Sequence, residues 1–288
     1  MANTITLKRR IGSVRNTRQI TKAMELVAAS KMRKAQEYAL AGRTYRQFAY
    51  SLLTRLSAIT EVGEHPLFVS RPVKNRLYIV VTSNGTLAGA YNANIIRLLT
   101  RRVLADQKAG IKTKAIAVGK QGAKFARRVE GIDLIAAYTE IPDHPEANDI
   151  RSILNTAIEL FRDVLIDDVS ILYTQFKSNL VQEATSLSLL PARFENTEEE
   201  NSLNNTTFEP SIDVVLDNVA ERLLEVQVWQ ALLESLASEH SMRMMAMKNA
   251  TDNASDIIDD LTLAFNTARQ AAITQELAEI TGGAEAMK

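Results

Sequence analysis

Apolar and small residues recur at steps of three and four near both ends of the chain. This spacing returns side chains to one face of an α-helix, so each segment is predicted to carry a heptad seam, the line of residues that packs against a partner helix. The N-terminal pattern is broken only at Lys31 and runs through Met24, Ala28, Ala35, Tyr38, Gly42, Tyr45, Ala49, Leu52, Leu56 and Ile59. The C-terminal pattern runs through Leu233, Ala237, His240, Met244, Met247, Thr251, Ala254, Ile258, Leu261, Phe265, Ala268 and Ala272.

The C-terminal segment is predicted to be an unusually long helix, because neither glycine nor proline lies between Pro210 and Gly282. About 70 helical residues span roughly 100 Å, a length typical of coiled coils, membrane spans or helical repeats. Its many charges exclude a membrane span. Since neither apolar stripe can be buried alone, we predict that the helices of residues 1–70 and 210–288 form a long antiparallel coiled coil.

Residues 75–195 show a different pattern, in which short apolar runs alternate with helical periodicity. This order predicts a Rossmann-like α/β domain with a mostly parallel sheet, whose last strand is antiparallel. The polar, acidic stretch at 195–211 predicts an exposed loop. The expected strands are Leu77–Thr82, Lys114–Val118, Leu134–Tyr138, Val169–Phe176 and Thr185–Leu190, and the expected helices are about Tyr91–Gln107, Gln121–Arg128 and Asn148–Leu165.

Two glycine-containing loops follow predicted strands, where an α/β protein can hold a phosphate on backbone amides. The first is TSNGTLAGAYN, with Gly85 and Gly89, and the second contains Gly119, Lys120 and Gly122. Neither matches the dinucleotide pattern, nor the phosphate loop with its lysine and hydroxyl. Structural turns are the favoured interpretation, and a nucleotide-binding α/β enzyme is the alternative.

Residues able to form a metal or catalytic site are scattered. His65, His144 and His240 lie far apart in the sequence, and there is no cysteine to complete a metal-ligand pattern. Met242, Met244, Met245 and Met247 are more typical of flexible helix packing than of copper binding. No serine, histidine and acid can be assembled into a triad. We therefore expect no catalytic, cofactor or metal site.

Acidic and basic residues balance, with 34 of each, so only local charge is informative. The first forty residues are basic, with Lys8, Arg9, Arg10, Arg15, Arg18, Lys22, Lys31, Arg33 and Lys34 against Glu25 and Glu37. A nucleic-acid-binding coiled coil is one interpretation. However, aromatic residues are not interleaved, and ion pairing with Asp252, Asp256, Asp259 and Asp260 of the other helix, or with another protein, explains the charge equally well.

The absence of cysteine fits a reducing compartment. No apolar run approaches the ~20 residues that cross a bilayer, and the charged start MANTITLKRR does not have the apolar stretch of a signal peptide. We therefore expect an intracellular chain whose membrane association, if it has one, is through partners.

Both ends of the chain carry long motifs of a known family. Residues 8–36, KRRIGSVRNTRQITKAMELVAASKMRKAQ, and residues 237–286, beginning ASEHSMRMMAMKNATDNASDIIDDL, resemble the first and last helices of the gamma subunit of the F-type ATP synthase. The middle is less similar, since the family usually has an aspartate, a basic residue, a glycine and a cysteine where this chain has Asn84, Gly85, Thr86 and Ala88. The inserted redox-active cysteine pair of the chloroplast form is missing, so the resemblance is to the bacterial type.

The resemblance implies a non-catalytic rotor in the central stalk of the F1 sector. Its partners would be the ring of alpha and beta subunits, the epsilon subunit and the membrane c ring, on the cytoplasmic side of the bacterial plasma membrane. By the same resemblance, Met24 lies close to Arg243 and to acidic residues of a beta subunit, while Glu209 lies near the c ring. Arg269, Gln270 and Thr274 correspond to the positions that engage a loop of the beta subunit, and the heptad pattern independently predicts that they lie off the seam.

Overall fold

The computed structural model describes residues 2–57, 65–142, 145, 147–192 and 212–286. It divides into two compact units, of which the first contains Met1–Ala28 and Arg243–Lys288 and the second contains Ala29–Met242. Two long helices, α1 (Ala2–Ser57) and α5 (Ile212–Ala286), each contribute one end to each unit. None of the described helices is long and apolar enough to cross a membrane.

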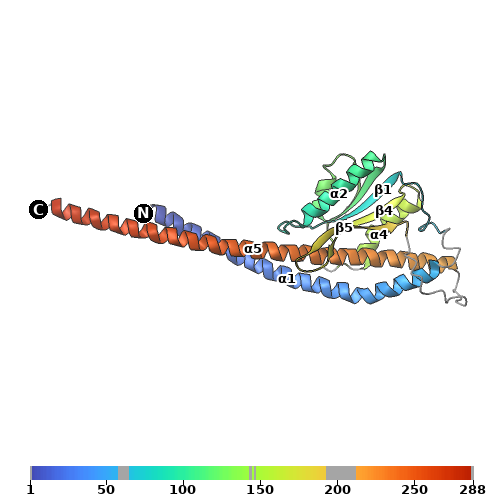
Figure 1. The fold of residues 1–288 in the computed structure, drawn as a ribbon, viewed down its shortest axis with the longest axis horizontal. Helices are drawn as coiled ribbons and strands as arrows, with labels where there is room; N and C mark the ends of the chain where they lie inside the picture. The colour runs from blue at the N-terminus through green and yellow to red at the C-terminus, as the bar shows by residue number, and fades with distance from the viewer. Residues whose placement is uncertain (1, 58–64, 143–144, 146, 193–211, 287–288) are drawn as a thin grey trace. The chain divides into compact units, whose positions relative to one another are not determined.

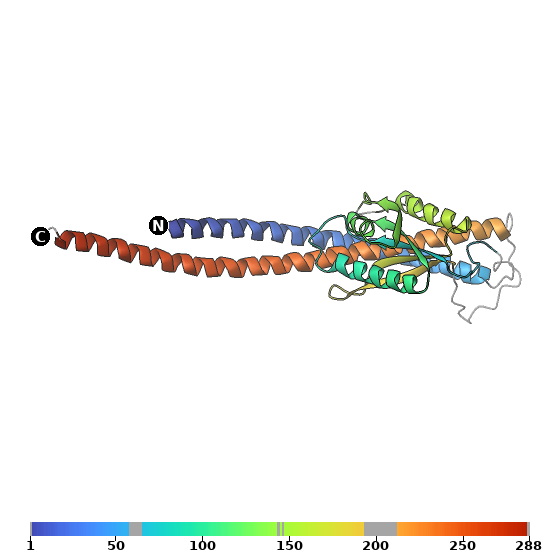
Figure 2. The same ribbon diagram turned by 90° about the horizontal axis from the view of Figure 1, so that it is seen from above.

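In the first unit, the N-terminal end of α1 and the C-terminal end of α5 lie side by side and antiparallel (Figures 1 and 2). Ile11, Thr21 and Ala28 are buried on α1, and Met247, Ala254 and Ile258 are buried on α5. Every α5 residue of the predicted seam, from Leu233 to Ala272, is buried or half-buried. Beyond Ala272 the described part of α5 is exposed, and it extends past the start of α1.

The seam predicted for α1 is partly wrong. Tyr38 is 46% exposed, whereas Met32, which the predicted seam skips, is only 6% exposed. The buried line steps by four from Ala28 to Met32 and by three to Ala35, and its next half-buried member is Ala39. Because 3.6 residues make a turn, a step of four was needed after Ala35 where the prediction took a step of three.

The N-terminal helix is also shorter than the expected segment of residues 1–70. Residues 65–74 are turns, bends and loop up to the start of the first strand. Pro66 lies in this stretch and cannot continue a helix, since it has no backbone N–H to donate. Side chains in the later part of α1, including the predicted seam from Gly42 to Ile59, lie outside the described residues.

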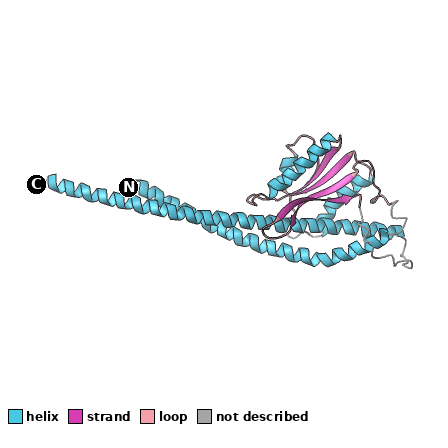
Figure 3. Ribbon diagram, viewed as in Figure 1, coloured by secondary structure: helices cyan, strands magenta, loops and turns pink. Residues whose placement is uncertain are grey.

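The second unit contains a five-stranded sheet in the order β3-β2-β1-β4-β5 (Figure 3). The strands β1 to β4 are parallel, and β5 runs antiparallel to β4, so the predicted fold class is confirmed. Ile79 in the central strand pairs with Ile116 on one side and Ile171 on the other. The strands are β1 (Asn75–Val81), β2 (Lys112–Val118), β3 (Ile132–Tyr138), β4 (Asp168–Phe176) and β5 (Gln182–Leu190).

Helices cover both faces of the sheet. On one face α2 (Tyr91–Lys108) packs on Tyr78, Val80 and Leu172, with Phe125 of α3 (Lys120–Ala126) beside them. On the other face α4 (Ala147–Arg162) and the first half of α5 pack on Leu77, Ile79 and Val81. Alternate β1 side chains therefore enter opposite layers, as a strand's period of two requires, and each buried Leu or Ile contributes about 1.5–3 kcal/mol.

The helix α4 ends at Arg162 and not near Leu165 as predicted. Val164 has a φ of 60°, a left-handed conformation that stops a helix and is unusual for a β-branched residue. Val164 and Leu165 are both largely exposed. The apolar periodicity of the sequence does not indicate that the helix ends at Arg162, because the apolar residues Val164 and Leu165 follow it.

Candidate functional site

The helix pair of the first unit carries opposite charge on its two helices. On α1, Lys8, Arg15 and Lys22 recur every seven residues and are exposed, and Arg18 lies beside them. On α5, Asp252, Asp256 and Asp259 recur at steps of four and three and are also exposed. Helical spacing therefore makes a basic stripe on α1 and an acidic stripe on α5.

These two stripes do not neutralise each other. Within the described residues, no ion pair joins the basic stripe of α1 to the aspartates of α5. Lys22 instead bonds to Glu25 of its own helix, with Nζ 3.0 Å from Oε1. The sequence left open pairing between the helices and pairing with another protein. Pairing between the helices is thus unsupported, and the charged side chains of the two stripes other than Lys22 are left for solvent or another protein.

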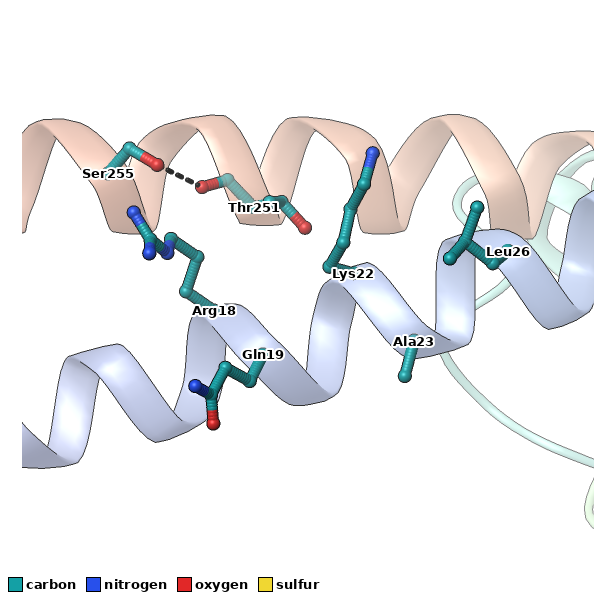
Figure 4. Close-up of a pocket in the computed structure, with 7 residues that line it drawn as sticks. All are labelled: Arg18, Gln19, Lys22, Ala23, Leu26, Thr251 and Ser255. Carbon is teal, nitrogen blue, oxygen red and sulfur yellow. Dashed lines mark hydrogen bonds between the residues drawn. The ribbon is translucent and has the colours of Figure 1, made fainter.

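A shallow groove of about 490 Å³ lies between the two helices (Figure 4). From α1 it is lined by Arg18, Gln19, Lys22, Ala23 and Leu26, and from α5 by Thr251 and Ser255. Arg18 and Lys22 reach from α1 toward α5 in this view. Leu26 is 60% exposed, so the groove combines cations, hydroxyl groups and an apolar side chain on an open surface.

A polar contact lies inside the seam beneath this groove. Thr251 Oγ1 lies 2.8 Å from Thr21 Oγ1 and 2.8 Å from the carbonyl oxygen of Met247. Thr21 Oγ1 donates in turn to the carbonyl of Arg18 at 3.0 Å. Each hydroxyl can also bond to a carbonyl of its own helix, whereas the bond between the two threonines is made in only one register, so this contact favours that alignment of the helices.

The residues expected to contact partners are placed as follows. Arg269, Gln270 and Thr274 are exposed, which confirms that they lie off the seam. Thr274 Oγ1 donates to the carbonyl of Gln270 at 2.9 Å, so its hydroxyl is held against the helix. Met24 and Arg243 are half-buried on the two helices of the first unit. Glu209 and the acidic stretch around it lie outside the described residues.

In the second unit, the loops that follow the parallel strands bind one another. Three consecutive backbone amides at the start of α3 donate hydrogen bonds to the loop that follows β1. The amide of Lys120 donates to Asn84 Oδ1 at 3.1 Å, and that of Gln121 donates to the Ser83 carbonyl at 3.2 Å. The amide of Gly122 donates to Thr82 Oγ1 at 2.8 Å. These are the donors that a phosphate would need. The geometry therefore supports structural turns at this edge.

The glycines of the second loop are explained by the same packing. A Cβ at Gly119 would lie 2.1 Å from the Thr82 carbonyl oxygen, and the φ of Gly119 is 98°. A Cβ at Gly122 would lie 2.8 Å from Thr82 Oγ1. Close approach of β1 to α3 thus requires glycine at both positions without any ligand.

Near the start of α2, which follows β1, a serine of α5 contacts both α2 and β4. Ser235 Oγ lies 2.7 Å from the hydroxyl of Tyr91 and accepts from the amide of Thr174 at 3.2 Å. Further along α5, Ser238 Oγ donates to the Thr174 carbonyl and Ser241 Oγ to the Asn179 carbonyl, each at 3.1 Å. Sequence reasoning missed this contact, whose only sign was serine at 235, 238 and 241 among the apolar and charged residues of α5.

The amino ends of the strands hold a buried charged cluster. Asp106 is 2% exposed and accepts from the Tyr78 hydroxyl at 2.8 Å, from Thr113 Oγ1 at 3.3 Å and from Arg76. Burial, followed by the bond to Asp106, raises the pKa of Tyr78. Burial alone would lower the pKa of Arg76, but the nearby carboxylates of Asp168 and Asp106 raise it overall. The cluster joins α2 to three strands and is best explained as structural.

The histidines have separate roles. His65 Nε2 lies 3.0 Å from Asp217 Oδ1, while its Nδ1 accepts from the Leu67 amide. His240 is buried in α5, as the seam predicted, and His144 lies outside the described residues. Within the part of the chain that the structure describes, no three His, Asp or Glu side chains gather as metal ligands do.

The fold is that of an α/β protein with two long helices, α1 and α5, which pair antiparallel in the first unit. The sequence model described as ATP synthase matches residues 3–287. The ATP synthase gamma chain of Moorella thermoacetica is 40% identical over 288 residues, covering 100% of both chains. That of Desulfitobacterium hafniense is 41% identical over 290 residues, again covering 100% of both. The chain belongs to the ATP synthase gamma chain family.

Solved structures share the fold. A chain of the Euglena gracilis mitochondrial ATP synthase (OSCP/F1/c-ring) has a TM-score of 0.69 at 19% identity, covering 99% of this chain and 95% of that one. A chain of the Tetrahymena thermophila mitochondrial ATP synthase (central stalk/c-ring) has a TM-score of 0.63 at 24% identity, covering 80% of this chain and 99% of that one. Because both sequence identities are below 25%, the similarity to these two structures establishes the fold alone.

Proposed function

We propose that this chain is the non-catalytic rotor of an F-type ATP synthase. Its helix pair turns inside a ring of alpha and beta subunits and couples ion flow through the membrane sector to ATP synthesis or hydrolysis. The epsilon subunit and the c ring are its other partners. The complex holds it as a peripheral protein on the cytoplasmic side of the bacterial plasma membrane. The family membership of the whole chain supports this assignment.

The observation that carries the mechanism is the unequal charge of the helix pair. A basic stripe with Lys8, Arg15 and Lys22 lies on one helix, and an acidic stripe with Asp252 and Asp256 lies on the other. A single chain with different faces cannot contact three identical ring sites in the same way. Each site is therefore held in a different conformation, and rotation exchanges the three.

The required energy is within reach of such contacts. Moving a site from a 1:99 to a 99:1 ratio of two conformations takes roughly 5.5 kcal/mol of differential affinity. Hydrogen bonds to charged groups contribute about 1.5–3 kcal/mol each. About two to four bonds from residues such as Arg18 or Arg269, made to one ring conformation and not to the others, are sufficient. No chemical step is needed from this chain.

Nucleotide chemistry is assigned to the ring. The α3 amides that would receive a phosphate bind Asn84, Ser83 and Thr82, and Ser235 of α5 bonds to Tyr91 and Thr174. We expect the isolated chain to give no heat of ATP binding in calorimetry at micromolar concentrations. ATP binding that disappears on substitution of Lys120 would identify a nucleotide-binding enzyme instead.

Reconstitution tests the assignment as a whole. The chain is mixed with alpha and beta subunits of a close relative, and assembly and ATP hydrolysis are measured with and without it. A rotor joins the ring at one copy per three beta subunits and raises its steady-state turnover. Failure to join the ring, together with salt-sensitive retention on DNA, would favour the nucleic-acid alternative.

A further inference from the structure

The layer formed by α2 and α3 carries an unbalanced positive charge. Between Tyr91 and Gly131, the only acidic residues are Asp106, which is buried, and Glu130, which is exposed. The whole chain is neutral, so this charge is segregated onto one surface. We call the following nine exposed side chains the basic face: Arg97, Arg101, Arg102, Lys108, Lys112, Lys120, Lys124, Arg127 and Arg128.

Helical spacing arranges much of this charge in two rows. On α2, Arg97, Arg101 and Lys108 lie at steps of four and seven, opposite the side that packs on the sheet with Ile95 and Leu99. On and just after α3, Lys120, Lys124 and Arg127 lie at steps of four and three. The two helices contact each other, so the rows are neighbours on a rigid support.

The opposite layer of the same unit pairs its arginines with acids. Arg151 Nε lies 2.7 Å from Glu225 Oε1, Arg162 Nη2 lies 2.9 Å from Asp217 Oδ1, and Arg222 also bonds to Glu225. By contrast, none of the nine side chains of the basic face forms an ion pair with any residue that the structure describes. Like charges at a spacing of four residues repel each other, and a bound anionic partner relieves this repulsion.

We propose that the basic face binds a carboxylate-rich segment of another protein. Five of its nine residues are arginine, whose planar guanidinium donates two parallel hydrogen bonds to one carboxylate. A row of cations at helical spacing matches acidic side chains repeated along a second helix. The surface lies outside the helix pair to which rotation is assigned, so either function can hold without the other.

Lipid and nucleic acid fit this surface less well. Adsorption to a membrane surface uses a row of large apolar side chains that enter the acyl region, and Leu104 is the one large apolar residue strongly exposed on the described α2 and α3. Binding of single-stranded nucleic acid uses aromatic platforms for the bases. Phe125, the one aromatic residue of α3, is half-buried against the sheet.

Zero-length carbodiimide crosslinking of the intact ATP synthase complex tests the proposal. The reagent joins a lysine to a carboxylate with which it is in ion-pair contact, so Lys108, Lys120 and Lys124 report on the partner. Mass spectrometry of the products is expected to show these lysines joined to Asp or Glu of another polypeptide. The yield should fall as salt is raised.

Three variants separate charge from geometry. The triple change Arg97→Gln, Arg101→Gln and Arg127→Gln keeps the reporter lysines and should lower the crosslink yield about tenfold. Changing the same three residues to Lys retains the charge and should restore most of the yield. Arg151→Gln, Arg162→Gln and Arg222→Gln remove equal charge from the opposite layer and should leave the yield unchanged.

The contrary results are equally specific. Crosslinks only within this chain, or none from the three lysines, would overturn the proposal. A second contrary result is binding of the chain to vesicles of equal parts phosphatidylglycerol and phosphatidylcholine, or to duplex DNA, without any protein crosslink. Loss of that binding in the first triple variant would show that it depends on the basic face. Those results would assign the face to lipid or to nucleic acid.

Discussion

Thr21 of α1 and Thr251 of α5 share a hydrogen bond across the helix pair, with their Oγ1 atoms 2.8 Å apart. Their neighbours along the seam, Met247 and Ala254 on α5 and Ala28 on α1, are apolar and buried. Apolar contacts of this kind are compatible with more than one alignment of two helices, whereas the threonine pair is made in only one. We infer that this pair sets the register that places the charged stripes.

A double-mutant cycle measures this contact. Because each valine removes the same hydrogen bond, we expect Thr21→Val and Thr251→Val to show a coupling of about 1 kcal/mol in the free energy of unfolding. Urea unfolding of the helix pair, followed by circular dichroism, gives the four values. Thr262→Val is the control, since its hydroxyl donates to the Ile258 carbonyl of its own helix, and it should be additive with Thr21→Val. Additivity of the Thr21 and Thr251 changes would show that the contact does not set the register.

The sequence predicted α5 better than α1 for a physical reason. Every α5 residue of the predicted seam is at least half-buried, because an uninterrupted helix keeps its period over many turns. On α1 the prediction missed Leu7, Ile11 and Val14, and it placed Tyr38 in the seam, because lysines and arginines surround the apolar residues there. Where charged residues are dense, few apolar residues mark the seam, so the next seam residue can be placed three or four positions further along the helix with equal support from the sequence.

The sheet was predicted within a few residues, whereas the site contacts were not. The four parallel strands appear as apolar runs and were recognisable for that reason, and the antiparallel β5 was also predicted, although from Thr185 and not from Gln182. The bond from Tyr91 to Ser235 joins residues 144 positions apart, and nothing in either local sequence identifies its partner. The unpaired charges of the basic face also required the structure, since their sequence spacing alone does not show which acids lie near.

Asp106 is predicted to be essential for the stability of the α/β domain. Asp106→Asn removes the charge that Arg76 faces and weakens the acceptor of the Tyr78 hydroxyl. Because these groups are buried or half-buried, the free energy of unfolding should fall by about 2–3 kcal/mol. Urea unfolding followed by the fluorescence of Trp229, which lies in the same unit, measures the change. The exposed Asp133→Asn should change stability by less than ~0.5 kcal/mol, and equal effects of the two variants would refute the structural role of Asp106.

Met24→Lys is predicted to lower coupling while assembly survives. Met24 is half-buried on α1, and a lysine there adds a cation able to bind a partner carboxylate and hold the rotor at one angle. In membrane vesicles that carry the variant complex, less proton pumping should accompany each ATP hydrolysed. Met24→Leu keeps the apolar side chain and should couple normally. Normal pumping efficiency in the lysine variant would exclude this role for the position.

Arg269→Ala combined with Gln270→Leu is predicted to weaken ring assembly or steady-state ATPase activity severalfold. Both side chains are exposed and lie off the seam, so their loss should leave the helix content unchanged. The physical reason is the loss of charge-assisted bonds to one ring conformation and not to the others. Circular dichroism of the variant is compared with its reconstitution with alpha and beta subunits. Glu276→Gln, an exposed change further along α5, is the matched control. Unchanged assembly and turnover in the double variant would show that this side of α5 does not carry coupling.

Direct observation of rotation tests the central claim that one asymmetric chain turns within the ring. A gold rod is attached through a single cysteine placed at the exposed Asn179 of this otherwise cysteine-free chain, in a ring fixed to glass through its beta subunits. With ATP present, we predict rotation in one direction with three equally spaced dwell positions in each turn. A rod that stays fixed while the same ring hydrolyses ATP would contradict the rotor function.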